Sequence, residues 1–553
     1  MGKRLFDKRN RFGIRKLSVG VCSVVVATCF LGVTTSYAEE QAERSETREE
    51  RVDTSDVEHQ GEEDKTVKEH QEESEHSSPA TSEKEIRAVS QGTEAAQPAT
   101  SLDEEPEIAD YGPLPSKAQM QYHREELAAF IHFGMNTYYD REWGDGQEDP
   151  YYFYPEHLDT DQWIKTLKDA GFKRTIMVVK HHDGFLLYPS KYTDHTIAKS
   201  SWKEGKGDVL AEVSASASKY DMDMGVYLSP WDAHSPLYHV DTEDQYNEYY
   251  LNQLKEILED PKYGNKGKFV EVWMDGARGD GAQKVTYTFD KWFDAIRKAQ
   301  GDIAIFSAEP TNVRWIGNEK GIAGDPVWQK VNPDKIRNNP SNSYLNHGDP
   351  EGKQYSVGEA DVSIRSGWFY HDNQEPKSLR ELMDIYFKSV GRGTPLLLNI
   401  PPNQDGKFAD ADVARLKEFR QTLDQLYSVN YAAGALVEAD STRRNAHYSA
   451  SHLTDGDEKT SWAPADDAKT GSFVLDLGKE QHFDVVELKE TIEKGQRISG
   501  FTIDVAVNGQ WVPFGAGSTV GYRRLIKGQP VDSRYIRVSI TDAQATPILN
   551  GVS

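Results

Sequence analysis

The chain has 553 residues, a formal net charge of −26 and an aromatic content of 10%. Its length allows two or more domains, one of them with a large core. The acidic balance argues against nucleic acid, whose phosphates attract basic surfaces, and against peripheral binding to anionic lipid.

A basic N-terminal segment precedes an apolar run from Leu17 to about Val33, and small residues follow up to Ala38. This order predicts a secretory signal peptide over residues 1–38. The alternative is an uncleaved membrane anchor, which the shortness of the run disfavours.

Both cysteines, Cys22 and Cys29, fall in this segment. The exported protein therefore has no disulfide, thiol nucleophile or thiolate metal site. The stretch 12–23 resembles the YSIRK-type signal of Gram-positive surface proteins. That resemblance implies a secreted or cell-wall location, with no membrane contact after cleavage.

Residues 39–107 are rich in Glu, Ser, Thr, Gln and Ala and nearly lack aromatic side chains. Such a segment cannot bury enough apolar surface to offset the entropy lost on ordering, so a disordered acidic linker is predicted. The alternative is a long charged helix, which the scattered Ser, Pro and Gly residues disfavour.

Apolar, β-rich runs alternate with helical patterns from residue 108 to residue 437. A helix is expected over 159–171, which has an acidic start, apolar residues at helical spacing and a terminal glycine. Five strand-like runs carry residues suited to sugar chemistry near their ends: 129–134, 177–184, 225–232, 269–276 and 303–309. With a last strand at 394–400, this alternation predicts an α/β fold, a TIM-like (β/α)8 barrel that gathers its strand ends on one face.

The helical patterning stops near residue 438. Short alternating segments follow at 472–478, 483–488, 500–507 and 534–540. This spacing predicts an antiparallel β-sandwich domain over 438–553.

Asp275 follows an apolar strand at the expected mouth of the barrel, and Trp273 lies two residues earlier on the same side of that strand. A carboxylate stabilises an oxocarbenium-like transition state at a sugar carbon, and an indole ring packs on the sugar. An Asp before a Gly is, however, often only a turn residue. The two residues alone therefore leave both interpretations open.

Two adjacent histidines, His181 and His182, follow the second strand-like run. In a regular strand they would point to opposite faces, but at a strand end both could reach one pocket. Metal binding is the competing function, with His132 or Asp183 as a third ligand. Buried structural histidines are the remaining alternative.

Taken in order, these motifs resemble glycoside hydrolase family 29, the retaining α-L-fucosidases, over roughly residues 112–437. The resemblance is carried by His132, Glu142-Trp143, His181-His182-Asp183-Gly184-Phe185, Tyr227 and Trp273-Met274-Asp275-Gly276. It implies that Asp275 is the nucleophile and that catalysis needs no metal and no cofactor. It also implies that fucose is bound by His132, Glu142, Trp143, His181, His182, Tyr227 and Trp273.

The position of the acid/base varies across that family, and the candidates beyond the nucleophile are Glu309, Glu319 and Glu359. Glu319 lies in a loop rich in Gly and Asn, 44 residues past Asp275. This arrangement resembles the subfamily that acts on α-1,3/4-linked fucose in branched glycans. We therefore expect Glu319 to be the acid/base, with a raised pKa, and Glu359 to be the alternative.

The resemblance implies a retaining exo-α-L-fucosidase that releases terminal α-1,3/4-linked fucose from branched, Lewis-type glycans by double displacement. Its partners would be fucosylated oligosaccharides and glycoproteins. Trp315 and Trp368 are candidate platforms for the sugar next to fucose, although buried core positions are an equal alternative. A non-catalytic cell-surface fucose-binding lectin and a metal hydrolase using the histidine pair are the competing functions.

Early in the C-terminal segment, Asp455-Gly456-Asp457 and Trp462 resemble a turn of discoidin-type, galactose-binding-like modules. In such modules this turn often holds a structural calcium, a hard cation that oxygen-rich turns suit. The chain stops at Ser553, before the final strand that such modules usually have, so a truncated or incomplete module is expected.

Overall fold

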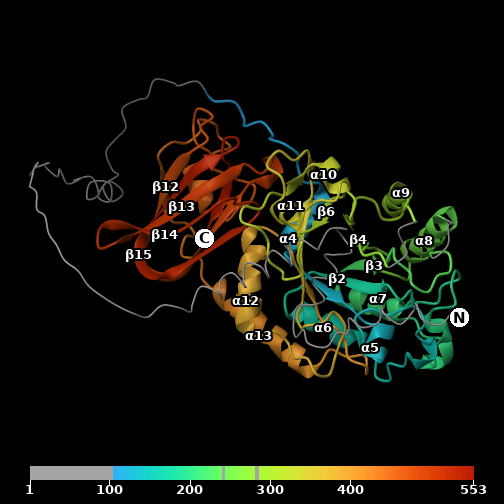
Figure 1. Cartoon of the computed structure of the whole chain (residues 1–553). Coiled ribbons are helices and arrows are strands. Elements are labelled where there is room, and N and C mark those ends of the chain that lie inside the picture. Colours follow the sequence, from blue (N-terminus) through green and yellow to red (C-terminus); the bar gives the residue numbers. More distant parts are fainter. Residues whose placement is uncertain (1–103, 239–242, 280–284) are drawn as a thin grey trace, which may run out of the picture.

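The computed structural model describes residues 104–238, 243–279 and 285–553. In Figure 1 an α/β barrel, coloured blue to orange, adjoins a β domain in red. The signal peptide predicted over 1–38 and most of the linker predicted over 39–107 lie outside the described residues.

Eight parallel strands of the described chain close the barrel in the order β1-β10-β9-β6-β5-β4-β3-β2. They are β1 (Leu127–Ile131), β2 (Arg174–Lys180), β3 (Asp223–Leu228), β4 (Glu271–Trp273), β5 (Ala304–Phe306), β6 (Val313–Trp315), β9 (Val357–Ser363) and β10 (Leu396–Asn399). The predicted TIM-like barrel is confirmed. The sequence does not predict β6 or β9. Strand β6 has only three residues, and β9 is buried although it contains the acidic residues Glu359 and Asp361, which are not typical of a buried strand.

Helices cover the outside of the barrel (Figure 1). The longer ones are α4 (Lys117–Glu125), α6 (Thr160–Asp169), α7 (Val209–Tyr220), α8 (Glu243–Leu258), α9 (Phe289–Gln300), α12 (Leu379–Lys388) and α13 (Asp410–Leu426). Helix α6 shows why they form: the Asp159 side chain caps its first turn, and its apolar stripe, with Trp163 and Leu167, is buried against the strands. The helix predicted at 159–171 is thus confirmed.

Shorter elements decorate this frame. They are α5 (Met135–Tyr139), α10 (Pro333–Arg337), α11 (Asn342–His347) and the hairpin strands β7 (Lys330–Val331) and β8 (Gln354–Tyr355). The last four are inserted between β6 and β9, where a regular barrel would have one helix.

An aromatic layer fills the barrel interior. The Trp273 ring stacks on Phe306 with centroids 3.8 Å apart and on Tyr227 at 5.1 Å. Phe130 packs edge-on against the same indole at 5.0 Å. These rings close the barrel below its carboxyl end, so any cavity there has a rigid floor.

The C-terminal domain is an antiparallel sheet structure, as predicted. Its strands are β11 (Leu436–Ala439), β12 (Gly471–Glu490), β13 (Ile498–Val507), β14 (Gln510–Gly517), β15 (Arg524–Ala543) and β16 (Leu549–Val552). Register shifts between β12 and β15 bend these two long strands, and the core they enclose contains Trp462, Phe473 and Phe501. The final strand, β16, pairs with β12.

Partly buried charges join the two domains. Arg523 Nη1 lies 2.9 Å from Glu126 Oε2 of the barrel, and its Nε lies 2.5 Å from Glu487 Oε1. Gln496 Oε1 accepts a hydrogen bond from the backbone N–H of Gln329 at 2.8 Å. The domains therefore contact each other through specific polar groups as well as apolar surface.

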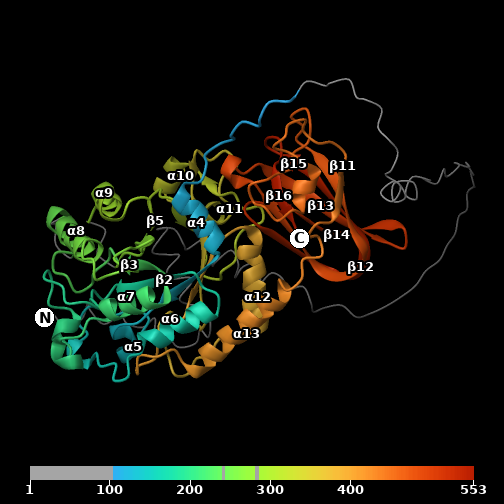
Figure 2. The same cartoon turned by 180° about the vertical axis from the view of Figure 1, so that it is seen from behind.

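The described end of the predicted linker, residues 104–107, lies against the C-terminal domain. The Glu105 carboxylate accepts hydrogen bonds from the backbone N–H groups of Arg444 and Asp466 at 2.8 and 2.7 Å. Figure 2 shows this blue segment running along the red domain before it enters α4.

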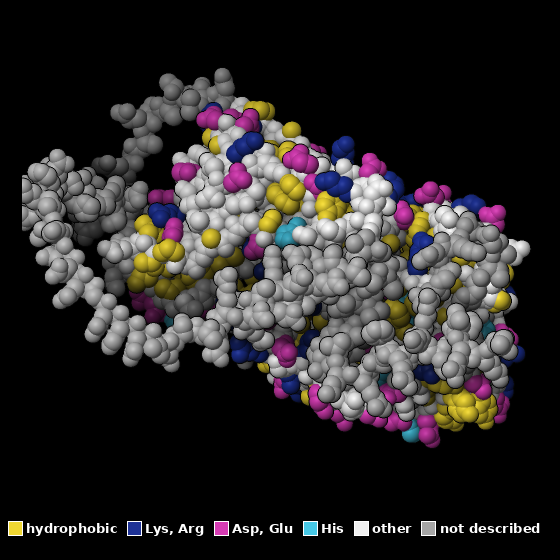
Figure 3. Space-filling view, viewed as in Figure 1, with side chains coloured by type: hydrophobic (Ala, Val, Ile, Leu, Met, Phe, Trp, Pro, Cys, Tyr) yellow, Lys and Arg dark blue, Asp and Glu magenta, His cyan; other side chains and the backbone are white. Residues whose placement is uncertain are grey.

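In the described part of the chain, every helix falls short of the length or apolar character that a membrane span requires. On the face seen in Figure 3, the coloured Lys and Arg side chains are interspersed with Asp and Glu, without a continuous basic stripe among the described residues.

Candidate active site

A pocket opens at the carboxyl ends of the barrel strands. It is lined by Phe130, His132, Trp143, His181, His182, Tyr227, Trp273, Asp275, Phe306, Trp315, Glu319, Asp361 and Trp368. Ten of the eleven predicted site residues are among them, and Glu142 is the exception. The mixture of aromatic and polar side chains suits a small sugar.

Asp275 lies two residues beyond β4 and is both a turn residue and a pocket residue. Its Oδ1 accepts a hydrogen bond from the backbone N–H of Ala277 at 2.8 Å, which closes the turn. Its Oδ2 accepts a hydrogen bond from the Tyr227 hydroxyl at 3.0 Å, and the side chain is 17% exposed. One carboxylate oxygen is thus oriented by the backbone and the other is available near the pocket.

Glu319 is carried by the loop that follows β6. The next glycine, Gly321, has φ +68° and donates its N–H to the Asp361 carbonyl at 3.1 Å, so the loop is tied to β9. Burial, followed by the carboxylates of Asp361 and Asp275, raises the pKa of Glu319 to about 9. Glu319 is therefore protonated near neutral pH, as an acid catalyst requires.

The hydrogen bonds of His132 assign its tautomer. Its Nδ1 lies 2.8 Å from Asn399 Oδ1. The Asn399 amide nitrogen donates to Ser363 Oγ and to the Trp368 carbonyl, so Oδ1 must be the acceptor. His132 Nδ1 then carries the proton and Nε2 is an acceptor. Burial lowers the pKa of His132 to about 3, so the ring is neutral at pH 7.

His182 has the same tautomer through a different partner. Ser229 Oγ donates to the Trp231 carbonyl at 2.7 Å, so it accepts from His182 Nδ1 at 2.8 Å. His182 Nε2 is left as an acceptor 3.8 Å from Asp275 Oδ2. Burial lowers the pKa of His182 to about 4. A sugar hydroxyl placed there could donate to the ring beside the carboxylate.

The other two acid/base candidates lie elsewhere. Glu359, on β9, is fully buried behind the aromatic layer, where its Oε1 accepts a hydrogen bond from Trp273 Nε1 at 2.7 Å. Glu309 is 36% exposed and pairs with Arg337 at 3.7 Å. Of the three glutamates, all of which are described, Glu319 alone lines the pocket with Asp275.

Glu142 lies behind the pocket wall instead of lining it. Its carboxylate accepts hydrogen bonds from the backbone N–H groups of Trp368 and Phe369 at 2.7 and 3.3 Å. His371 Nε2 lies 2.6 Å from the same carboxylate, and the hydrogen bond to Glu142 raises the pKa of His371 to about 9. Glu142 thus anchors the loop that carries Trp368, and Trp143 beside it reaches the pocket.

Asp361 is a pocket residue that the sequence analysis missed. Its Oδ1 accepts a hydrogen bond from Trp315 Nε1 at 2.9 Å, and burial raises its pKa to about 8. The residue lies on the unpredicted strand β9, so its sequence neighbourhood carries no motif. The one signal in the sequence is that Asp361 and Glu359 are two residues apart in the stretch 357–363, a spacing that places both on the same side of a strand.

Among the described residues, no group of three or more His, Cys, Asp or Glu side chains is placed to hold a metal ion. In the turn predicted to hold calcium, Asp455 Oδ1 and Asp457 Oδ1 accept the backbone N–H groups of Asp457 and Lys459 at 2.9 and 3.0 Å. Asp455 Oδ2 accepts the Thr460 hydroxyl at 2.8 Å. Within the described residues, these carboxylates serve to close the turn.

Comparison with protein families matches three segments of the chain. Residues 111–425 match the alpha-L-fucosidase family, residues 437–550 the F5/8 type C domain, and residues 7–32 the YSIRK type signal peptide. The first match covers more than half of the chain. The last indicates secretion or surface localisation in a Gram-positive bacterium.

Curated relatives and solved structures agree with these matches. The chain is 40% identical over 442 residues to putative alpha-L-fucosidase 1 of Oryza sativa subsp. japonica, covering 79% of this chain and 84% of the relative. It resembles the crystal structure of SpGH29 at 58% identity and a TM-score of 0.79, covering 81% of this chain and 99% of that one. A Ruminococcus gnavus GH29 fucosidase in complex with fucose shows 40% identity and a TM-score of 0.77, covering 81% and 96%.

Proposed function

The chain belongs to the α-L-fucosidase family, glycoside hydrolase family 29, and from that premise we propose that it is a retaining exo-enzyme acting on terminal α-1,3/4-linked fucose in branched glycans. The observation that carries the proposal is a pair of carboxyl groups in one pocket with different surroundings. Asp275 accepts two hydrogen bonds, whereas burial and neighbouring acids keep a proton on Glu319. A carboxyl group that keeps its proton, opposite a hydrogen-bonded carboxylate that can act as nucleophile, suits double displacement.

In the proposed mechanism, Asp275 Oδ2 attacks the anomeric carbon of fucose. Glu319 gives its proton to the departing glycosidic oxygen, so the leaving sugar departs as a neutral alcohol. Water then gives a proton to the Glu319 carboxylate and attacks the fucosyl–Asp275 ester, which releases fucose with retained configuration and restores both groups.

The proposed fucose contacts follow from the pocket wall. His132 and His182 each offer an unprotonated Nε2, so each would accept a hydrogen bond from a sugar hydroxyl. The aromatic floor around Trp273 offers an apolar surface for the fucose methyl group. The fucose bound to the similar Ruminococcus gnavus fucosidase supports this assignment by likeness.

The preference for branched glycans rests on the position of Glu319 in its loop and on two indoles at the pocket wall. Trp315 and Trp368 both line the pocket, which supports a role as platforms for the sugar attached to fucose. Fucosylated oligosaccharides and glycoproteins at or outside the cell surface are the proposed substrates. We also propose a structural calcium in the C-terminal module, at the oxygen-rich turn Asp455-Gly456-Asp457.

Fucose release from a Lewis-type trisaccharide tests this function. We expect release of fucose alone, with the α configuration in the first-formed product by NMR. A first-formed β product would refute the retaining mechanism, and a folded protein that bound the trisaccharide without cleaving it would support the lectin alternative. Loss of activity on chelation, restored by zinc, would favour the metal hydrolase alternative.

A further inference from the structure

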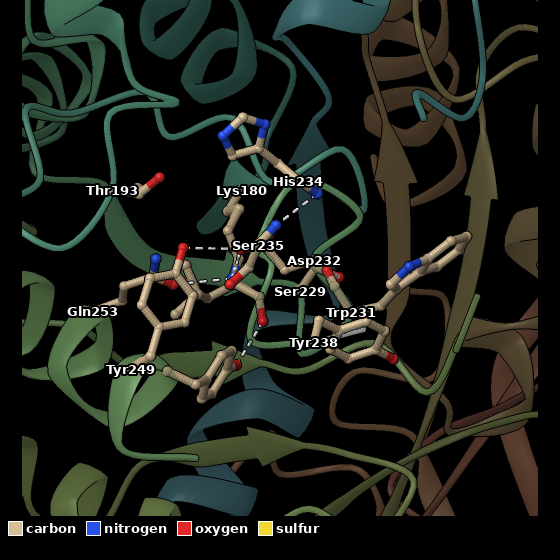
Figure 4. A network of polar contacts seen from close by, with 12 residues as sticks. Lys180, Thr193, Ser229, Trp231, Asp232, His234, Ser235, Tyr238, Tyr249 and Gln253 are labelled. Atoms are coloured by element: carbon tan, nitrogen blue, oxygen red, sulfur yellow. Dashed lines mark hydrogen bonds and ion pairs between the residues drawn. The ribbon is translucent and has the colours of Figure 1, made fainter. Parts of the chain in front are cut away.

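A buried ion pair lies beside the His182 wall of the pocket. It joins Lys180, the last residue of β2, to Asp232 in the loop after β3 (Figure 4). Lys180 Nζ lies 3.3 Å from Asp232 Oδ2 and 2.9 Å from Gln253 Oε1, and the paired side chains are 0% and 1% exposed. Neither residue lines the pocket. Because taking two charges out of water often costs more than their attraction returns, stability alone explains such a pair poorly.

Asp232 also collects hydrogen bonds that shape its loop. The Tyr249 hydroxyl, from α8, donates to Asp232 Oδ2 at 3.0 Å (Figure 4). The backbone N–H groups of His234 and Ser235 donate to Oδ1 at 3.1 and 2.8 Å. Burial raises the pKa of Asp232, but Lys180 and these donors outweigh burial and hold the pKa below its ordinary value. The loop is therefore organised around an ionised carboxylate.

Three contacts connect this loop to His182, so the position of the loop determines the position of the ring. The backbone N–H of Ala233 donates to the His182 carbonyl at 2.8 Å. The Trp231 ring stacks on the His182 ring, with centroids 4.6 Å apart and planes at 20°. Ser229 Oγ accepts a hydrogen bond from His182 Nδ1 at 2.8 Å. A Cβ at Gly279 would lie 2.4 Å from the Trp231 indole, so the close approach of the backbone to this ring requires glycine there.

We propose that Lys180 and Asp232 are positioning residues for the fucosidase reaction. Their ion pair fixes the loop after β3, so that Ser229 holds His182 in the tautomer that accepts a fucose hydroxyl beside Asp275. The inference rests on the proposed roles of His182 and Asp275. An apolar pair of equal volume would fill the same space, but it would not gather the backbone N–H groups that give the loop its shape.

A non-additivity experiment tests this chain of contacts. We compare kcat/KM on a Lewis-type trisaccharide, per folded protein, for Lys180→Met, Asp232→Asn, Ser229→Ala and the Asp232→Asn/Ser229→Ala double variant. Each single variant is expected to lose about tenfold, the effect of one misplaced hydrogen bond. The kcat/KM of the double variant is expected to be at most about twofold below that of the less active single variant, because both changes release the same histidine. Tyr249→Phe, which weakens the hold on Asp232 without changing charge, is expected to lose roughly threefold and replaces Asp232→Asn if that variant does not fold.

Glu125→Gln is the matched control. Glu125 pairs with Arg174 at 2.7 Å at the opposite end of β2, and its side chain is only 9% exposed. This variant is expected to lower the melting temperature while kcat/KM stays within about twofold. Multiplied losses in the double variant, or unchanged kcat/KM in folded Lys180→Met, would overturn the inference and leave the mechanism standing. Activity in Asp275→Asn would instead refute the mechanism.

Discussion

Replacing Glu319 by Gln tests the proposed acid/base, because the change keeps the shape of the side chain and removes its transferable proton. In the pocket, burial together with Asp361 and Asp275 raises the pKa of Glu319 from 4.5 to about 9. Since a tenfold change in an equilibrium constant corresponds to about 1.4 kcal/mol, ionising Glu319 here costs roughly 6 kcal/mol more than in water. At pH 6, about one molecule in a thousand has lost this proton.

We expect Glu319→Gln to lower kcat/KM on a Lewis-type trisaccharide by about 10²–10⁴-fold, the usual contribution of a general acid. A fucoside with a good leaving group should lose roughly tenfold or less, since its oxygen departs without needing a proton. The kcat/KM of the unmodified protein should fall near pH 9, where Glu319 ionises, and this alkaline limb should be missing in the variant. Steady-state kinetics from about pH 5 to pH 10 measure both effects.

The control is Glu359→Gln, which makes the same chemical change behind Trp273. It keeps an oxygen that can accept the Trp273 N–H, so we expect a loss of about tenfold or less on both substrates. If Glu359→Gln abolished trisaccharide cleavage while Glu319→Gln retained it, the assignment of the acid/base would be wrong.

Asp275→Asn should reduce turnover by several orders of magnitude, and azide should rescue it to give a fucosyl azide of inverted configuration, which NMR identifies; near-normal turnover would exclude this nucleophile. Glu142→Gln should raise KM for branched glycans about three- to tenfold with a smaller change in kcat, because the loop it anchors loses a charged acceptor; an unchanged KM would contradict that role. Arg523→Met should lower the free energy of unfolding by about 1–3 kcal/mol at pH 8, because it leaves two largely shielded carboxylates unpaired. The loss should be smaller at pH 5, since burial raises the pKa of Glu126 to about 7 and a protonated carboxyl tolerates the missing partner. Urea denaturation checks this, with the exposed Arg420→Met as a control that should change stability by less than about 0.5 kcal/mol.

The strand ends that carry motifs are the part of the barrel that sequence reasoning could locate. His132, His181 and Asp275 each lie within two residues of the end of a strand that is rich in apolar residues. The apolar run predicts the strand, and the motif that follows predicts the functional residue at its end. Strand β9 gives no such signal, because Glu359 and Asp361 are buried on it through contacts with indole N–H groups from β4 and β6. Those partners are distant in the chain, so local pattern cannot reveal them.

The sequence also could not predict residue roles that depend on contacts between segments distant in the chain. The motif that includes Glu142 predicts a sugar-binding acid, but the partners of that acid are backbone N–H groups more than 200 residues away. The same holds for Lys180 and Asp232, whose pairing depends on how α8 packs on the ends of β2 and β3. The sequence shows which groups are near the chemistry, whereas their mutual orientation is a property of the folded chain.

The low pKa values of the pocket histidines have a consequence for where such an enzyme can work. A fall from pH 7 to pH 5 adds no proton to His132 or His182, because burial lowers their pKa values to about 3 and 4. A glycan-coated surface that becomes acidic would therefore meet two pocket histidines that stay neutral, and their hydrogen-bond acceptors for the sugar would persist.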